Sequence, residues 1–290
     1  MIQGSIVALI TPFRDGRLDE AALCRMVEWH IEQGTHGIVP VGTTGESPTL
    51  SHDEHCRVIE LVVKQSAGRV PVIAGAGSNN PIEAIESTRV AERAGADATL
   101  HVAGYYNRPN QDGLYHHFKM VHDETNIPII LYNIPPRAIV DIQPATMARL
   151  AELPRIIGVK DATGDLSRPW SERQLIKKPF VWLSGEDATA VAYNVSGGTG
   201  CISVTANVAP KLVAQVQELT LAGKWEEAKA LQDRLIPLHQ AMFAETRPAG
   251  AKYAASLLGL CTEACRVPVM PLSEATKLRI RSAMEQLALI

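Results

Sequence analysis

The sequence has no apolar stretch that approaches the ~18 residues required by a membrane-spanning helix. Its first residues, MIQGSIVALITPF, form an apolar run without a preceding basic residue, which predicts a first strand and not a signal peptide. An excess of one charge is also lacking, because 28 Lys and Arg nearly balance 31 Asp and Glu, for a formal net charge of -3. These absences argue against a membrane or a nucleic acid as partner.

Cysteine motifs are absent as well. The five cysteines are scattered and odd in number, and none has CxxC spacing; Cys261 and Cys265 lie close together but lack a second pair for zinc. This pattern favours a reduced, cytoplasmic protein over a disulfide framework. His52 and His55 have the spacing of a metal-binding pair but no third ligand, so we expect no metal.

Cofactor-binding loops are also missing. The run Gly75-Ala76-Gly77 lacks the third glycine of a dinucleotide-binding loop, and there is no P-loop or nucleophile elbow. We therefore expect no nucleotide cofactor. The glycine-rich run at 197–200 precedes the last apolar run, which is the wrong end of a barrel for a phosphate site, so a phosphorylated sugar is disfavoured as substrate.

What the chain does contain is a recurring unit. Short apolar runs of strand length alternate with amphipathic segments of helical period, as strands buried on both faces and their covering helices do. The repeat is roughly 20–35 residues, the size of a βα unit. Eight units predict a closed (β/α)8 TIM barrel and not an open doubly wound sheet. The eight runs are 4–13, 37–46, 71–79, 98–107, 127–135, 156–164, 180–188 and 200–207.

The segment after the eighth unit has helical patterns and no further strand. We expect a catalytic barrel at residues 1–223 and a C-terminal helical appendage at residues 224–290.

Lys160 lies within the apolar run IIGVKDATG at 156–164. Burying an ionised ammonium is costly, so the amine either extends to water or to a carboxylate such as Asp161 or Glu186, or acts as a nucleophile. Burial disfavours the charged form of a lysine, and the neutral amine can attack a ketone to form a Schiff base. We favour the nucleophile, because polar residues at the carboxyl ends of barrel strands are usually functional.

Further candidate residues follow the neighbouring strands. The phenol of Tyr132 could shuttle protons, with Thr43 and Tyr106 as a relay. Arg137 could bind a substrate carboxylate through two hydrogen bonds. A hydrogen-bonded core aromatic for Tyr132 and a surface salt bridge for Arg137 remain open as alternatives.

Six segments together resemble the class I pyruvate-dependent aldolase family over essentially the whole chain. The resemblance implies that Lys160 forms a Schiff base with pyruvate and that Tyr132, Thr43 and Tyr106 relay protons, with Tyr106 supplied by a neighbouring subunit. It also implies a homotetramer built from tight dimers. The six segments are GTTGE (42–46), YYNRP (105–109), YNIPPR (132–137), GVKDATG (158–164), LSGEDA (183–188) and ISVTANVAP (202–210).

The resemblance also implies how the substrates are held. Thr44 would help to hold the pyruvate carboxylate, and Arg137 would receive the carboxylate of L-aspartate 4-semialdehyde in a condensation that leads to lysine through diaminopimelate. Gly185 and Ile202 would line the site through their backbones. Feedback inhibition by L-lysine is implied at a dimer interface formed by Ser47, His52, His55, Asn79, Glu83 and Tyr105.

The sequence departs from the family pattern in two places. Ala103-Gly104 stands where the family usually has Thr-Pro, and Pro136 and Ala138 flank Arg137 where Gly and Thr are frequent. Two other functions stay open: a sialic-acid or 2-keto-3-deoxy sugar acid lyase of the same family, and a non-catalytic barrel that binds a metabolite. Arg137 argues against the first, because a polyol needs no cation there.

Overall fold

The computed structural model describes residues 2–290. Eight parallel strands form one sheet in the order β4-β1-β10-β9-β8-β7-β6-β5. The two ends of this order meet, because Ile38 forms a parallel bridge with Val72 and the backbone N–H of Gly75 donates to the carbonyl of Pro40 at 3.0 Å. The sheet therefore closes, and the barrel expected from the sequence is confirmed.

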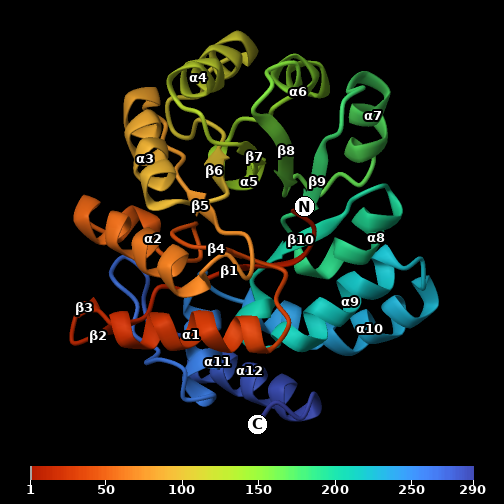
Figure 1. Ribbon diagram of the computed structural model, residues 1–290. Coiled ribbons are helices and arrows are strands. Elements are labelled where there is room, and N and C mark those ends of the chain that lie inside the picture. The colour runs from red at the N-terminus through yellow and green to blue at the C-terminus, as the bar shows by residue number, and fades with distance from the viewer. Residues whose placement is uncertain (1) are drawn as a thin grey trace.

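Each expected apolar run contains one strand, which ends before the run does. Figure 1 shows the helices arranged in a ring around these strands. The strands are β1 (Gly4–Ala8), β4 (Gly37–Val39), β5 (Ile73–Gly75), β6 (Ala98–Val102), β7 (Ile129–Asn133), β8 (Ile156–Asp161), β9 (Val181–Ser184) and β10 (Gly200–Ser203). The ring helices are α1 (Glu20–Glu32), α2 (His52–Ser66), α3 (Pro81–Ala94), α4 (Gln111–Glu124), α6 (Pro144–Ala151), α7 (Arg168–Leu175), α8 (Ala190–Val195) and α9 (Pro210–Leu221).

Smaller elements follow β1, β4, β7, β9 and β10 along the chain. They are the hairpin β2 (Phe13–Arg14) and β3 (Arg17–Leu18), the short helix α5 (Pro135–Ala138), and single 3-10 turns at Ser47–Thr49, Asp187–Thr189 and Thr205–Asn207.

Local sequence signals explain where helices begin and end. Ser51 and Glu54 form a capping box at the start of α2, so two backbone N–H groups that the helix leaves free are satisfied. Helix α2 is capped at its C-terminal end by Ala67, which adopts a φ of 48°. Helix α3 is capped by Gly95, whose φ of 85° suits a residue without Cβ.

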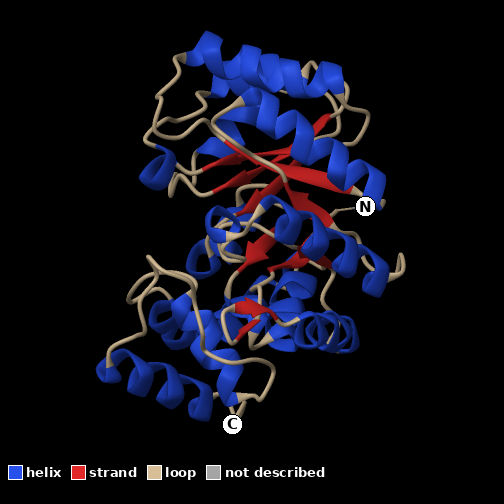
Figure 2. Ribbon diagram, turned by 90° about the vertical axis from the view of Figure 1, so that its left-hand side faces the viewer, coloured by secondary structure: helices blue, strands red, loops and turns tan. Residues whose placement is uncertain are grey.

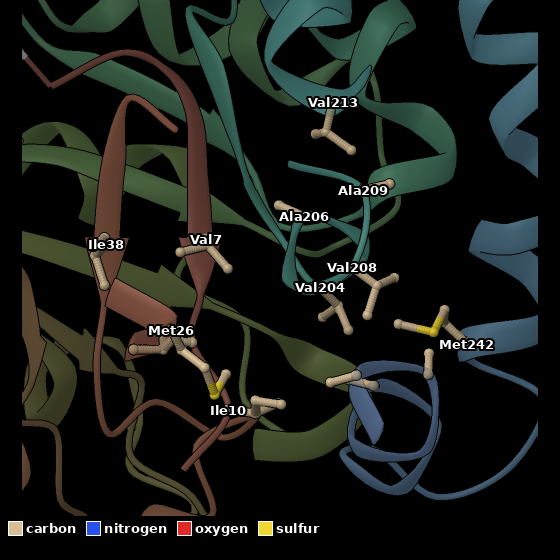
Figure 3. Packing of buried hydrophobic residues seen from close by; sticks show 14 of the residues in the cluster. Val7, Ile10, Met26, Ile38, Val204, Ala206, Val208, Ala209, Val213 and Met242 are labelled. Carbon is tan, nitrogen blue, oxygen red and sulfur yellow. The ribbon is translucent and has the colours of Figure 1, made fainter. Parts of the chain in front are cut away.

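The C-terminal helices α10 (Trp225–Met242), α11 (Ala249–Leu257) and α12 (Glu274–Gln286) share an apolar core with the barrel. Figure 3 shows Val7 and Ile38 of the first strands together with Val204 and Val208, which follow β10, and Met242 of α10. Figure 2 shows these helices as a layer at one side of the barrel. The division at residue 223 stays a proposal, since this core continues across it. Among residues 2–290, no helix is both long and apolar enough to cross a membrane.

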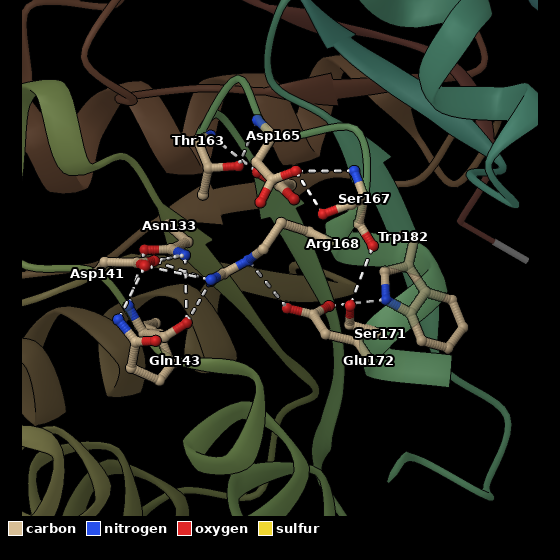
Figure 4. Close-up of polar contacts among 12 residues, drawn as sticks. Asn133, Asp141, Gln143, Thr163, Asp165, Ser167, Arg168, Ser171, Glu172 and Trp182 are labelled. Atoms are coloured by element: carbon tan, nitrogen blue, oxygen red, sulfur yellow. Dashed lines mark hydrogen bonds and ion pairs between the residues drawn. The ribbon is translucent and has the colours of Figure 1, made fainter. Parts of the chain in front are cut away.

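A polar network joins β7 and β9 through helix α7 (Figure 4). Asp141 accepts hydrogen bonds from Asn133 at 2.7 Å and from Arg168 at 2.8 Å. Arg168 also approaches Glu172 at 3.7 Å, and Glu172 accepts from the indole N–H of Trp182 at 2.9 Å. Burial raises the pKa of Glu172 to about 7. The network therefore links the strands on either side of β8, which carries Lys160.

Candidate active site

A cavity of about 310 Å³ opens at the carboxyl ends of the barrel strands. Apolar side chains from β1, β4 and β6 form part of its wall, and polar side chains come from β7, β8, α5, the loops after β4 and β6, and the turn before α11. The polar lining residues are Thr43, Thr44, Ser47, Tyr105, Tyr132, Arg137, Lys160 and Arg247.

Lys160 and Tyr132 face each other in this cavity. They are register partners on β8 and β7, so their side chains point to the same face of the sheet. Each is 7% exposed, and Nζ of Lys160 lies 4.3 Å from the centre of the Tyr132 ring. Within residues 2–290, no carboxylate lies at ion-pair distance from this Nζ; Asp161 instead accepts from the backbone N–H of Thr163 at 2.8 Å. The alternative in which Lys160 pairs with Asp161 or Glu186 is thus not observed.

Gly185 makes room for the lysine side chain. A Cβ at this position would lie 3.2 Å from Cε of Lys160, 2.8 Å from Cβ of Ala162 and 3.0 Å from the carbonyl oxygen of Asp161. Any larger residue would crowd the stem of the lysine. The backbone role expected for Gly185 stays a prediction.

Thr43 and Thr44 lie in the loop that follows β4, and both line the cavity. The loop folds back on itself, since the N–H of Gly45 donates to the carbonyl of Gly42 at 3.0 Å. The hydroxyl of Thr11 donates to the carbonyl of Gly45 at 2.6 Å and ties the loop to the end of β1. Thr44 is buried, whereas Thr43 is exposed toward the cavity mouth.

Two expected site residues lie outside the cavity wall. Tyr106 is 91% exposed and has a φ of 69°, and its neighbour Tyr105 lines the cavity instead. Ile202 is buried on β10 in register with Ile6, whereas Val204, two residues later, reaches the cavity. The roles expected for Tyr106, through a second subunit, and for Ile202, through its backbone, stay predictions.

The residues expected to form a lysine site lie along one rim of the barrel. Ser47 and Tyr105 line the catalytic cavity, and the side-chain amide of Asn79 donates to the carbonyl of Tyr105 at 3.2 Å. Glu83 is exposed and accepts from two nearby side chains, at 2.8 and 3.2 Å. The chain therefore brings part of this set together next to the catalytic cavity.

The two histidines of this set, His52 and His55, lie in the first turn of α2. Burial, with a smaller contribution from the charge of His52, lowers the pKa of His55 to about 4, so its imidazole is neutral at pH 7. His52 is exposed, and its Nε2 lies 3.6 Å from the sulfur of Cys56. Neither histidine lines the catalytic cavity.

The sequence analysis missed Arg247, which lies between α10 and α11. It lines the cavity together with Arg137, and both also line a wider cavity of about 760 Å³ that adjoins the first. Nη2 of Arg247 lies 3.5 Å from Glu186, and its guanidinium carbon lies 3.5 Å from the centre of the Phe243 ring. Local periodicity gives no sign of this residue, because it occurs in a turn of a segment that we expected to be only an appendage.

Within residues 2–290, no group of three or more His, Cys, Asp or Glu side chains could hold a metal ion. The side chains that line the cavity offer amine, phenol, hydroxyl and guanidinium groups.

A buried lysine beside a tyrosine, in a cavity at the carboxyl ends of barrel strands, defines a Schiff-base-forming lyase of the TIM-barrel class. The family model that matches residues 1–287 is described as the dihydrodipicolinate synthetase family. The chain belongs to this family, and the enzyme class expected from the sequence is confirmed.

Individual relatives are similar to this chain over nearly the whole length of both. The chain is 60% identical over 290 residues to the 4-hydroxy-tetrahydrodipicolinate synthase of Parvibaculum lavamentivorans, and the match covers all of both chains. It is 44% identical, with a TM-score of 0.97 and full coverage of both chains, to the dihydrodipicolinate synthase of Acinetobacter baumannii solved with pyruvate. It is 34% identical, with a TM-score of 0.96 over 99% of both chains, to the Cyanidioschyzon merolae enzyme solved with lysine bound.

Proposed function

We propose that this protein condenses pyruvate with L-aspartate 4-semialdehyde to 4-hydroxy-tetrahydrodipicolinate, a step on the diaminopimelate route to lysine. The observation that carries the proposal is Lys160: a buried amine, free of any carboxylate partner among residues 2–290, that faces a phenol inside the cavity. Relatives of the same length and 55–60% identity that are named for this activity support the choice of substrates.

The chemistry begins at Nζ of Lys160. The neutral amine attacks the ketone carbon of pyruvate, and loss of water gives an imine. The methyl group then loses a proton, and the resulting enamine attacks the carbon of the aldehyde. The amino group of the aldehyde substrate finally attacks the imine carbon, which closes the ring and releases the lysine.

Proton transfer accompanies each of these steps. Tyr132 is the group beside Lys160 that can give and take a proton as hydroxide leaves and as the enamine forms. Thr43 and Tyr106, the latter from a second subunit, would complete the relay, and Thr44 would hold the pyruvate carboxylate. Gly185 and Ile202 would contribute backbone groups to the same pocket.

Arg137 at the cavity mouth favours an aldehyde that carries a carboxylate. A guanidinium and a carboxylate match in geometry and charge, whereas the hydroxyl groups of a sugar acid or sialic acid would leave the cation without an anionic partner.

We further propose that L-lysine inhibits the enzyme at the rim formed by Ser47, His52, His55, Asn79, Glu83 and Tyr105. Glu83 would pair with an ammonium, and Asn79 would hydrogen-bond a carboxylate. The proximity of this rim to the cavity supports the proposal, since Ser47 and Tyr105 belong to both. A homotetramer in the cytoplasm is part of the same proposal and rests on the family pattern and the cysteine pattern of the sequence.

The test is reductive trapping of the imine. Pyruvate followed by borohydride should attach a 1-carboxyethyl group to the peptide that contains Lys160, because borohydride reduces the imine to a stable secondary amine. Lys160→Ala should lose both the adduct and turnover. Lys178 is a suitable control, because burial lowers the pKa of this lysine, while its Nζ donates to the carbonyls of Leu153 and Ile156 at 3.0 and 2.7 Å.

Lys178→Ala should therefore keep the adduct on Lys160. An adduct on a different lysine, or turnover in Lys160→Ala, would contradict the mechanism.

A further inference from the structure

We propose that Arg247 is a specificity-determining residue of the aldehyde subsite, where it binds the substrate carboxylate together with Arg137. This inference rests on the function proposed above and extends it to a residue of the C-terminal segment.

The position of Arg247 carries the first part of the argument. It lines the cavity that contains Lys160 and Arg137, and it also lines the wider adjoining cavity. A substrate that reacts at the enamine on Lys160 and extends outward would pass between these two arginines. Pyruvate occupies the inner end of this path, so the outer end is left for the aldehyde.

The bonding of Arg247 differs from that of the structural arginines. Arg266 donates to both carboxylate oxygens of Glu54 at 2.6 Å, and Arg168 reaches Asp141 at 2.8 Å. Among residues 2–290, the one hydrogen-bond partner of the Arg247 guanidinium is Glu186, at the long distance of 3.5 Å. Most of its five N–H donors are thus free for a ligand.

The aromatic contact holds Arg247 without using those donors. Its guanidinium carbon lies 3.5 Å from the centre of the Phe243 ring. Such stacking orients the plane of the group and leaves its edges, which carry the N–H donors, available for a carboxylate.

The charges at the site favour an anion. Burial lowers the pKa of Arg247, Glu186 opposes this effect, and the positive charge of Arg137 adds to it. Of the nearby carboxylates, Asp187 accepts from Ser203 and two backbone N–H groups and Glu245 accepts from Ser273, which leaves Glu186 as the one in contact with Arg247. The carboxylate of a substrate would add an anion between the two guanidinium groups, and the fixed forks of two arginines allow both of its oxygens to be bound.

The ligand class follows from this arrangement. The outer subsite fits a short aldehyde with a carboxylate at its far end. An uncharged or polyhydroxylated aldehyde would leave the half-buried cation of Arg247 and the exposed cation of Arg137 without an anionic partner, and polar groups left unpaired are a strong basis for rejecting a substrate.

Steady-state kinetics of Arg247→Gln tests this role. We expect kcat/KM for L-aspartate 4-semialdehyde to fall about tenfold to a hundredfold, mainly through KM, as expected when a hydrogen bond to a charged group is lost. The KM for pyruvate and the yield of the borohydride adduct should stay within about twofold of the wild type, because the inner end of the cavity is unchanged. Arg247→Lys should recover part of the loss, since it restores the charge without the fork.

A matched control is Arg173→Gln, because Arg173 also stacks on an aromatic ring, at 4.6 Å from the centre of Trp170, but lies outside both cavities. It should leave both KM values unchanged. In the double variant Arg137→Gln and Arg247→Gln, the loss should be smaller than the product of the two single losses, because both residues act on one carboxylate.

A wild-type KM for the aldehyde in Arg247→Gln would overturn the inference, and so would an equal loss of the pyruvate adduct, which would indicate a structural role. Wild-type enzyme that forms no adduct would instead contradict the proposed function. In that case succinate serves as a non-reacting carboxylate probe: weaker binding by Arg247→Gln in calorimetry supports the subsite, and equal binding overturns it.

Discussion

At Gly185 the absence of a side chain has a mechanistic consequence. A Cβ there would approach Cε of Lys160 to 3.2 Å, so Gly185→Ala should push the reactive amine away from its position. We expect kcat to fall about a hundredfold, the cost typical of a misplacement of about 1 Å. Circular dichroism and the thermal midpoint should show that the barrel still folds, and single-turnover trapping with borohydride should show slower formation of the imine.

The closest contact of that added methyl group would be Cβ of Ala162, at 2.8 Å. The double variant Gly185→Ala and Ala162→Gly removes this clash and leaves the contacts with Cε of Lys160 and with the carbonyl oxygen of Asp161. Full recovery of kcat in the double variant would show that crowding at Ala162, and not displacement of the lysine, causes the loss.

Glu83 gives the residue-scale prediction for regulation. Glu83→Ala should abolish inhibition by L-lysine and keep most of the turnover, because this exposed carboxylate is the group that we expect to pair with the lysine ammonium, and it does not line the catalytic cavity. Glu86→Ala is the matched control, since Glu86 is exposed on the same helix α3 one turn further on. Inhibition curves decide the matter: an unchanged inhibition constant in Glu83→Ala would exclude the proposed site.

Site residues differ in whether the sequence alone predicts their place in the cavity. Lys160 and Tyr132 could be predicted, because each interrupts or ends an otherwise apolar strand at the functional end of a barrel. Arg247 could not, because nothing in its own segment links it to the barrel. The role that we propose for Arg247 rests on the cavity that it lines and on its long contact with Glu186.

At the scale of elements, the C-terminal segment anchors the loop that carries Thr43 and Thr44. Lys252 of α11 is fully buried and forms an ion pair with Glu46 at the end of this loop. Its Nζ also donates to the carbonyl of Ala264 at 2.7 Å, and the backbone N–H of Arg266 donates to Glu46 at 2.9 Å. Helix α11 and the chain after it therefore determine where the loop lies.

Breaking this pair should be costly. Lys252→Met leaves the carboxylate of Glu46 buried without its cation, so we expect the free energy of unfolding to fall by about 3–5 kcal/mol. Lys252→Met combined with Glu46→Gln should recover part of this loss, since the amide is neutral and can still accept from Arg266. Urea unfolding measures both variants, and a loss below about 1 kcal/mol in the single variant would contradict a buried ion pair.

The elements themselves were largely predictable from period and end signals. Eight apolar runs gave eight strands, and three helical patterns after residue 223 gave α10, α11 and α12. What could not be predicted is where those last helices pack. Contacts such as Lys252 with Glu46 join residues far apart in the chain, and local periodicity contains no information about them.

For the whole molecule, the position of Tyr106 supports our proposal that a second subunit completes the relay. This tyrosine is 91% exposed and outside the cavity, and Tyr106 and Arg108 adopt φ values of 69° and 46°, in the left-handed region that such residues seldom occupy. Strained backbone of this kind is often found at functional sites, and here it directs a large aromatic side chain away from its own barrel. As the family pattern implies, we expect the side chain of Tyr106 to enter the cavity of a second copy of the chain.

Mixing two inactive variants tests this idea directly. Lys160→Ala lacks the amine, and Tyr106→Phe lacks the phenol that we expect one subunit to contribute to the active site of its partner. In a mixed dimer, the barrel of the Tyr106→Phe subunit has its own Lys160 and receives Tyr106 from the other subunit, so one of the two sites is complete. After equal amounts are unfolded and refolded together, random pairing in a two-fold symmetric dimer should restore about a quarter of the sites. Separately refolded samples mixed afterwards provide the control. If co-refolding restores no activity while each variant still dimerises, Tyr106 does not act across the interface, and the relay must be completed within one chain.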